Sequence, residues 1–503
     1  MDKNSTNVFK KYTDEVTWSK IVDYENVSSM WQHCINEYAD NIAIADGTSY
    51  TFKEVEKEVA SVRALLNEKG IKAGDRVGIY MPNCCAFAIS FLAITTMGAV
   101  AVLLPPHLDN VTVFGCTLKF QLKGLIYASE MEEKVAFAKE KNPAVIYITE
   151  SERSNDSLEM TFVSGKEPCT ILFTGGTTGK SKGALLSNKA LMRGVKNGCF
   201  GTKNVFGQRY VLVLPLTHVF GLIRNLLTSL YTGSAIFICR NNKDMFRDIA
   251  VFKPTVMVLV PALAEMALNL SKKFGKNMLG DSIKTIICGA AVVPPYLVSE
   301  YDKIGVTLLP GYGLTESANL VSGNPESKKN AEAVGYIYEG IEYKIVDGEL
   351  WIKGDNMMDC YVGEPEENEL SYEDGYFKTG DLVRMDEDNM LYIVGRKKEI
   401  IVLPSGENVS PAELESKFNT IDAIQDSLVY LDKSNVLSLQ VVPRLTVLNA
   451  LKIEDKETFL KEQILEVNKT LPAFERINKI VIRETDFLRS PSMKILRKEN
   501  SND

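Results

Sequence analysis

The sequence predicts an α/β protein in which parallel-type sheets are flanked by helices. Short runs rich in valine, isoleucine and leucine alternate with helical segments, as in residues 75–81, 86–94 and 99–104. Such alternation is typical of parallel strands, because the connections between them cross over as helices. The 503 residues are too many for one hydrophobic core, so length indicates about three domain-sized units.

The first of these helices is expected to begin after Thr51. Thr51 and Glu54 have the spacing of a capping box, in which each side chain satisfies a backbone N–H of the other residue. Valine and leucine then recur at helical spacing at positions 55, 59, 62 and 66, and Gly70 ends the helix.

Residues 86–106 are nearly all apolar, over about the length of a membrane span. Gly98 interrupts the run, and no basic residues flank it. We therefore expect a buried helix followed by a strand that is covered on both faces, and no transmembrane segment.

The same alternation continues through the next half of the chain. A strand, a helix and a strand are expected at 124–129, 132–141 and 144–149. Four further buried strands are expected at 209–216, 234–239, 255–260 and 285–290.

The pattern changes after Tyr336. Residues 343–356 and 391–403 are typical of hairpin-like strands with turn residues between them. A small α/β unit is expected beyond Ser410, with a helical stripe of Leu460, Ile464, Val467 and Leu471 and a strand at 477–484. The charged turn 395–399 is the best candidate for a domain boundary.

Composition excludes several classes of protein. The net charge of −8 and the pI of about 5.4 argue against nucleic acid as a partner, which favours a basic face. Nine scattered cysteines without a CxxC pair, and a polar N-terminus without a signal peptide, indicate a reduced, cytoplasmic protein. Oligomeric state leaves no signal in the sequence.

The stretch from Phe173 to Leu191, "FTGGTTGKSKGALLSNKAL", has the composition of a phosphate-binding loop. Its glycines let backbone N–H groups approach an anion, its hydroxyls can donate, and Lys180 and Lys182 add positive charge. A kinase-type P-loop requires a glycine at position 174, where this chain has threonine. The segment that follows is short and apolar, so a strand, a loop and a strand are expected.

Eight motifs, in order, resemble the adenylate-forming (AMP-binding) superfamily of acyl-CoA synthetases, luciferases and nonribosomal-peptide adenylation domains. They are TGGTTGKSKG (174–183), LPLTHVFGL (214–222), CGAAVVPP (288–295), GYGLTES (311–317), GYFKTGDL (375–382), YIVGRKKEII (392–401), GENVSPAELE (406–415) and LRSPSMKILRKE (488–499). The resemblance covers essentially the whole chain. It departs from the usual pattern at Ser181 and Leu488, which replace prolines, and at Met493, which replaces a glycine.

The resemblance implies two domains and a two-step reaction. Residues 1–396 would bind ATP and the acid and would include a small barrel-like β subdomain. Residues 397–503 would form a small, mobile α+β domain that turns about a hinge at Lys398. ATP would activate a carboxylic acid to an acyl-adenylate with release of pyrophosphate, and CoA, or the phosphopantetheine of a carrier protein, would accept the acyl group.

The same resemblance assigns the nucleotide site. Lys494, Thr315 and Glu316 would be catalytic, and Glu316 and Thr178 would hold Mg²⁺. The implied ATP or AMP contacts are Thr174, Gly175, Gly176, Thr177, Thr178, Gly179, Lys182, Gly289, Ala290, Ala291, Gly311, Tyr312, Gly313, Thr315, Asp381, Ile393, Arg396 and Lys494.

The acid would lie beside His218, Val219 and Phe220, and the pantetheine arm beside Gly406. This second motif lacks the aspartate that pairs with an amino-acid substrate, which favours a plain carboxylic acid. The loop 403–411 is similar to loops of fatty acyl-CoA synthetases, so a fatty acid is favoured over an aryl acid. Loading of a carrier protein in trans, and a non-catalytic adenylate-binding relative, remain alternatives.

Overall fold

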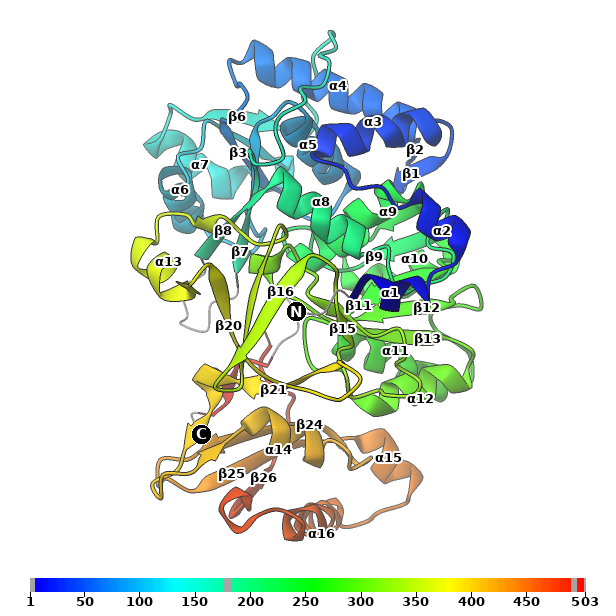
Figure 1. The fold of residues 1–503 in the computed structure, drawn as a ribbon, viewed down its shortest axis with the longest axis vertical. Helices are drawn as coiled ribbons and strands as arrows, with labels where there is room; N and C mark the ends of the chain where they lie inside the picture. The colour runs from blue at the N-terminus through cyan, green and yellow to red at the C-terminus, as the bar shows by residue number, and fades with distance from the viewer. Residues whose placement is uncertain (1–4, 175–181, 490–494, 502–503) are drawn as a thin grey trace.

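The computed structural model describes residues 5–174, 182–489 and 495–501 (Figure 1). Most of the chain forms one large body, and the residues after about 400 form a smaller unit at one end of it. The helices, in chain order, are α1 (Ser5–Lys10), α2 (Glu15–Lys20), α3 (Val27–Glu37), α4 (Phe52–Glu68), α5 (Cys85–Thr96), α6 (Asn110–Lys119), α7 (Glu132–Lys141), α8 (Asn188–Asn197), the π-helix η2 (Phe220–Leu227), α9 (Thr228–Tyr231), α10 (Met245–Phe252), α11 (Pro261–Phe274), α12 (Pro295–Lys303), α13 (Pro365–Ser371), α14 (Pro411–Phe418), α15 (Leu445–Ala450), α16 (Lys456–Lys469) and α17 (Arg497–Asn500).

A seven-stranded sheet has the order β18-β8-β7-β4-β3-β5-β6. Its strands are β3 (Arg76–Tyr80), β4 (Val100–Leu103), β5 (Gly124–Tyr127), β6 (Ile146–Thr149), β7 (Pro168–Thr174), β8 (Lys182–Ser187) and β18 (Cys360–Tyr361). The pairs from β7 to β6 are parallel, whereas β8 is antiparallel to both β7 and β18. The predicted strands, including the two on either side of residues 175–181, are thus confirmed.

The apolar run 86–106 is part of this layer. Helix α5 is buried along almost its whole length, and β4 is buried on both faces. Among the helices that the structure describes, none combines the length and the apolar character needed to span a bilayer. The predicted capping box at the start of α4 is also present, with the Glu54 N–H donating to Thr51 Oγ1 over 3.2 Å.

A nine-stranded sheet has the order β15-β14-β13-β12-β11-β9-β10-β1-β2. Its strands are β1 (Ile42–Ala45), β2 (Ser49–Thr51), β9 (Arg209–Leu212), β10 (Ala235–Ile238), β11 (Val256–Leu259), β12 (Thr285–Cys288), β13 (Thr307–Tyr312), β14 (Ser322–Gly323) and β15 (Tyr336–Ile337). The strands from β13 to β1 pair in parallel, and antiparallel strands lie at both edges. All four strands predicted between 209 and 290 belong to this sheet.

A five-stranded antiparallel sheet forms the predicted small β unit. Its strands are β16 (Ile341–Val346), β17 (Glu349–Gly354), β19 (Tyr372–Glu373), β20 (Tyr376–Met385) and β21 (Leu391–Arg396). β16 and β17 form the expected hairpin. The second expected hairpin, at 391–403, is wrong: β21 pairs with β20, and a 3₁₀ turn at Lys397–Glu399 separates it from β22 (Ile401–Val402).

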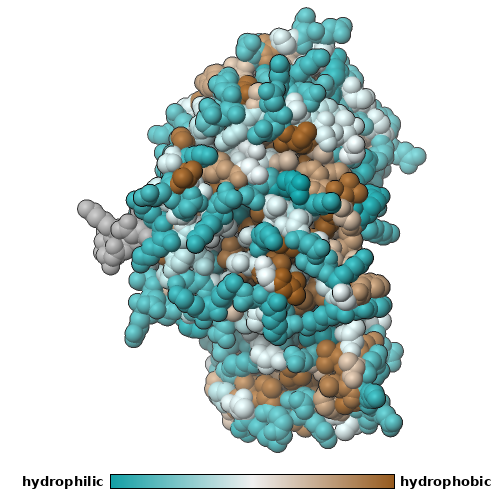
Figure 2. All heavy atoms as spheres, turned by 90° about the vertical axis from the view of Figure 1, so that its right-hand side faces the viewer, coloured by the Kyte–Doolittle hydropathy of each residue, from teal (hydrophilic) through white to brown (hydrophobic). Residues whose placement is uncertain are grey.

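The C-terminal unit has its own hydrophobic core. It contains the pair of β22 and β23 (Asn408–Val409) and a three-stranded sheet of β24 (Ile424–Leu431), β25 (Leu437–Pro443) and β26 (Lys479–Ile482). Leu460 and Ile464 of α16 are fully buried in this core, whereas Leu471 lies just beyond the helix. The face shown in Figure 2 is largely hydrophilic, with hydrophobic side chains in separate patches.

Candidate functional site

Glycines bring the carboxyl ends of β12 and β13 close together. A Cβ atom on Gly289 would lie 2.9 Å from the carbonyl oxygen of Gly311, and one on Gly313 would lie 1.2 Å from that of Asn319. No other residue fits at Gly313 without a backbone shift. Ligands of open α/β sheets bind at the carboxyl ends of the strands, so these glycines mark the edge of a candidate site.

Tyr312, Asp381 and Arg396 meet at this edge. The Tyr312 hydroxyl donates to Asp381 Oδ2 over 2.6 Å, and Arg396 Nε lies 2.8 Å from Asp381 Oδ1. Asp381 and Arg396 are opposite each other on the antiparallel strands β20 and β21. Three predicted residues from distant parts of the chain therefore form one contiguous group.

Burial and neighbouring charges shift the pKa values of Tyr312 and Arg396. Burial, and then the Asp381 carboxylate, raise the pKa of Tyr312 well above its ordinary value, so its hydroxyl stays protonated. Burial opposes the charge of Arg396, but the Asp381 carboxylate, together with Tyr312, Glu399 and Glu316, outweighs burial, and the pKa of the guanidinium is raised. Asp381, only 2% exposed, thus accepts from one neutral and one cationic donor.

Glu316 and Lys182 belong to a second group, centred on Tyr361. The Tyr361 hydroxyl donates to Glu316 Oε1 over 2.7 Å, and Lys182 Nζ lies 5.1 Å from the centre of the Tyr361 ring. Lys182 also forms a 2.5 Å ion pair with Glu367 of α13. The other Glu316 oxygen, Oε2, accepts no hydrogen bond within the described residues, and a carboxylate oxygen of this kind fits a hard cation such as Mg²⁺.

The two groups lie near each other. Tyr312 ends β13, and the 3₁₀ turn η4 (Thr315–Ser317), which carries Glu316, follows three residues later. The charge of Glu316 adds to that of Asp381 in raising the pKa of Arg396. Thr315, in the same turn, is buried at 7% exposure.

The residues predicted for the acid lie beside the glycine edge. The Phe220 ring reaches to 3.6 Å from the position of a Cβ on Gly289, and Val219 and Phe220 are buried. The Phe220 N–H donates to Nδ1 of the half-buried His218 over 3.3 Å. Ala290 has a φ of +66°, a conformation that glycine adopts more easily, and the adjacent Ala291 is exposed.

The other predicted residues fall into two sets. Thr174 is buried at the end of β7, Ile393 is half-buried on β21, Lys398 is exposed in the turn after Arg396, and Gly406 has a φ of +96° in an open turn of the C-terminal unit. Outside the described residues lie Gly175, Gly176, Thr177, Thr178, Gly179 and Lys494, together with Ser181 and Met493.

Two site residues were missed. Thr379 Oγ1 accepts from the Asp381 N–H over 3.1 Å and so orients the backbone at Asp381. It belongs to the Thr-Gly-Asp motif, which was a usable signal. Tyr361 lies 45 residues from Glu316, and no sequence pattern links the two.

Comparison with known proteins places the chain among sequences of similar length. Residues 31–362 match the family described as "AMP-binding enzyme", and residues 398–503 match "AMP-binding enzyme C-terminal domain". The chain is 28% identical to Peroxisomal OPC-8:0-CoA ligase 1 of Arabidopsis thaliana, over 91% of this chain and 89% of that protein. It is 26% identical to the Medium-chain fatty-acid--CoA ligase of Escherichia coli (strain K12), over 80% and 78%.

Solved structures share the fold. The anthranilate CoA ligase AuaEII in complex with anthranoyl-AMP matches with a TM-score of 0.84 at 20% identity, over 96% of this chain and 98% of that one. The agreement extends over both the large body and the C-terminal unit.

Proposed function

This chain belongs to the AMP-binding enzyme family, and from that membership we propose that it is an acid–thiol ligase of the acyl-CoA synthetase type. ATP and a carboxylic acid form an acyl-adenylate and pyrophosphate, and CoA then takes the acyl group as a thioester. The observation that carries the proposal is the convergence of Tyr312, Asp381 and Arg396 beside Glu316.

The Tyr312 group holds the nucleoside. The Tyr312 ring packs on the adenine, with Gly289, Ala290 and Ala291 along the other side. Asp381 accepts hydrogen bonds from the ribose hydroxyls, since a carboxylate accepts more than one bond per oxygen. The hydrogen bond from Tyr312 and the ion pair with Arg396 keep this buried carboxylate charged and oriented.

The phosphates lie toward the second group. Residues 174–179 and Lys182 surround the β- and γ-phosphates, and Thr315 contacts the α-phosphate. Glu316, with Thr178, holds Mg²⁺, which neutralises phosphate charge when it is bound. When the nucleotide binds, Lys182 leaves its ion pair with Glu367 and contacts the phosphates instead.

The two half-reactions need different positions of the C-terminal unit. Lys494 brings an ammonium to the acid carboxylate and the α-phosphate and stabilises the negative charge that develops between them. The unit, residues 397–503, then turns about Lys398, away from the domain formed by residues 1–396, and Gly406 lines the path of the pantetheine arm. A separate hydrophobic core and an exposed turn at Lys398 favour such a movement.

The acid lies against His218, Val219 and Phe220. These residues have no carboxylate to pair with an amino-acid ammonium. We propose an aliphatic acid of the fatty-acid type rather than an aryl acid, because the loop 403–411 is similar to loops of fatty acyl-CoA synthetases. A cytoplasmic location stays a prediction, with which the nine unpaired cysteines agree.

The test is release of pyrophosphate from ATP with a panel of acids, with and without CoA. Release with an acid and formation of its CoA thioester would support the proposal. Release without a thioester would favour loading of a carrier protein in trans. No release with any acid would overturn the proposal in favour of a non-catalytic adenylate-binding protein.

A further inference from the structure

One buried arginine has no acidic partner. The structure describes three buried arginines, Arg63, Arg224 and Arg444, at 1%, 3% and 8% exposure. Arg63 pairs with Glu56 over 2.6 Å, and Arg444 pairs with Glu265 over 2.6 Å. Within the described ranges, no carboxylate oxygen lies within 4 Å of the Arg224 guanidinium, and its Nη1 atom has no hydrogen-bond partner. A buried, unpaired cation is costly and calls for a ligand.

The position of Arg224 connects it with the proposed acid site. Arg224 lies four residues after Phe220 on the π-helix η2. Side chains at this spacing lie on nearly the same face of a helix. Phe220 reaches Gly289 at the glycine edge. Arg224 therefore lies about one helical turn beyond Phe220, whose ring borders the proposed acid site.

Other buried polar atoms around η2 also lack partners. Both side-chain polar atoms of Asn225 are unsatisfied, and so are the Nδ2 atoms of Asn197 and Asn319. Asn197 ends α8, which packs against η2, and Asn319 follows Ala318, whose carbonyl oxygen lies 2.2 Å from a Cβ built on Gly194 of α8. The unsatisfied amide groups of Asn197 and Asn319 thus lie on or beside α8, the helix that packs against η2. Native interiors rarely leave such groups unpaired, so bound water or a polar ligand is expected beside them.

The groups that respond to the Arg224 charge are neutral. Burial raises the pKa of Tyr338 and of Cys199 to about 12, and the Arg224 charge opposes both rises. Burial likewise raises the pKa of Tyr210, again opposed by Arg224. None of these three groups supplies a negative charge near neutral pH.

We propose that Arg224 binds a second carboxylate of the acid substrate, so that the substrate is an aliphatic dicarboxylic acid. One carboxylate reacts with ATP, and the other pairs with the guanidinium, whose planar fork suits bidentate binding of a carboxylate. This inference rests on the proposed function and specifies its substrate class.

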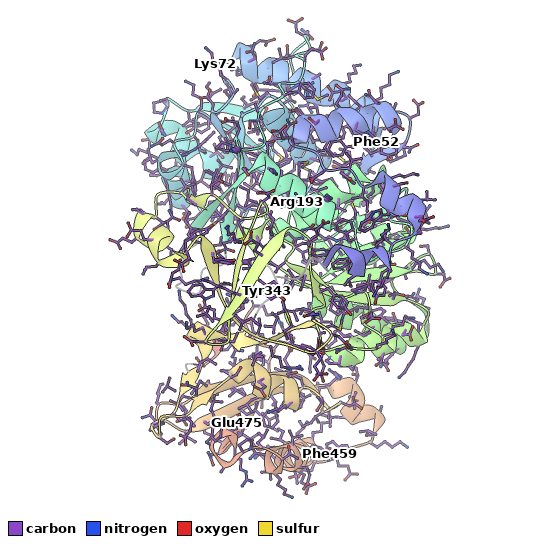
Figure 3. All side chains as sticks on the ribbon, viewed as in Figure 1. Phe52, Lys72, Arg193, Tyr343, Phe459 and Glu475 are labelled. Atoms are coloured by element: carbon purple, nitrogen blue, oxygen red, sulfur yellow. The ribbon has the colours of Figure 1, made fainter. Side chains whose placement is uncertain are left out.

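A second arginine serves as a matched control. Arg193 of α8, labelled in Figure 3, is 17% exposed and lies 3.1 Å from Asp23 and 3.6 Å from Asp355, so carboxylates of the protein already neutralise it. Replacing Arg193 therefore removes a partly buried guanidinium that is already paired with carboxylates of the protein, unlike that of Arg224.

The experiment compares monocarboxylic and dicarboxylic acids of equal chain length, such as hexanoate with adipate and octanoate with suberate. Initial rates of ATP-dependent pyrophosphate release are measured for the wild type and for Arg224→Met, Arg224→Lys and Arg193→Met. The wild type should prefer the dicarboxylate of at least one pair. Arg224→Met should lower kcat/KM for that dicarboxylate at least about 30-fold and leave its monocarboxylate partner unchanged or improved.

Two control variants test whether the preference for the dicarboxylate depends on the charge at position 224. Arg224→Lys should retain part of the preference, and Arg193→Met should retain all of it. Thermal unfolding of Arg224→Met should show a folded protein, since an uncharged side chain replaces a buried, unpaired charge. Stabilisation of the wild type, but not of Arg224→Met, by the dicarboxylate alone would give independent support.

The outcomes separate this inference from the proposed function. Activation of monocarboxylates alone, or an equal effect of Arg224→Met on both acids of a pair, would overturn the inference and leave the ligase proposal standing. No release with any acid would overturn both.

Discussion

At the scale of the residue, the candidate site depends on how Asp381 is held. Its two oxygens face a protonated tyrosine and an arginine, and its backbone N–H donates to Thr379. A cation and a hydroxyl donor thus replace the water that this buried side chain lost on folding.

Asp381→Asn tests the nucleoside role. The amide keeps the size of the side chain but loses the charge, and we expect the Kd for ATP to rise at least about tenfold. Isothermal titration calorimetry checks the change. Asp386→Asn, which alters a similar carboxylate that accepts from the Tyr392 hydroxyl over 2.7 Å, is the control and should leave the Kd unchanged. Equal affinities in both variants would remove Asp381 from the nucleotide site.

Lys494→Ala tests the division of the reaction into two halves. Without the ammonium, formation of the adenylate should fall by at least about 100-fold, as when an electrostatic donor is removed from other active sites. Transfer of the acyl group from a supplied acyl-adenylate to CoA should be little affected. Quenched assays of each half-reaction measure the two rates. An equal fall in both rates would contradict a movement of the C-terminal unit.

At the scale of the element, local sequence signals account for many of the strands and for the helices α4, α5, α7 and α16. The capping box of α4, the glycine-broken apolar run of α5 and β4, and the two strands on either side of residues 175–181 all follow from neighbouring residues. The π-helix η2 had no such signal. Its geometry carries both Phe220 and Arg224, and π-helices are frequent at functional sites.

Thr51→Ala tests the α4 cap. The variant loses the hydroxyl that accepts the Glu54 N–H, and we expect the free energy of unfolding to fall by about 1 kcal/mol. Urea denaturation followed by circular dichroism measures the change. Ser49→Ala, at an exposed position two residues earlier, should change the stability by no more than about 0.5 kcal/mol. A Thr51→Ala protein as stable as the control would show that the capping box contributes nothing.

At the scale of the whole molecule, a buried ion pair joins the C-terminal unit to the large body. Arg444, which follows β25, pairs with Glu265 of α11, and its Nη2 atom also lies 3.3 Å from the Tyr296 hydroxyl of α12. Removing one member of a buried pair leaves the other charge uncompensated. This contact therefore favours the orientation in Figure 1 over others.

Arg444→Met should release the C-terminal unit. With Glu265 left unpaired, we expect the distances between spin labels on the two bodies to spread over a broader range. Pulsed electron spin resonance measures that distribution. The double variant Arg444→Met with Glu265→Gln should be less broad than the single variant, because it leaves no buried charge unpaired. An unchanged distribution in the single variant would show that other contacts set the orientation.

By itself, the sequence determined the alternating strands and helices, the capping box and the phosphate-binding stretch, because these depend on periodicity and on residues a few positions apart. Resemblance to a family pointed to Tyr312, Glu316, Asp381 and Arg396 as one site. Only the tertiary structure decided that β21 pairs with β20, that Tyr361 holds Glu316, and that Arg224 is buried with no carboxylate of the described residues beside it. Each of these depends on which distant segments pack together, and hence on the balance of burial and hydrogen bonding across the fold rather than on any local pattern.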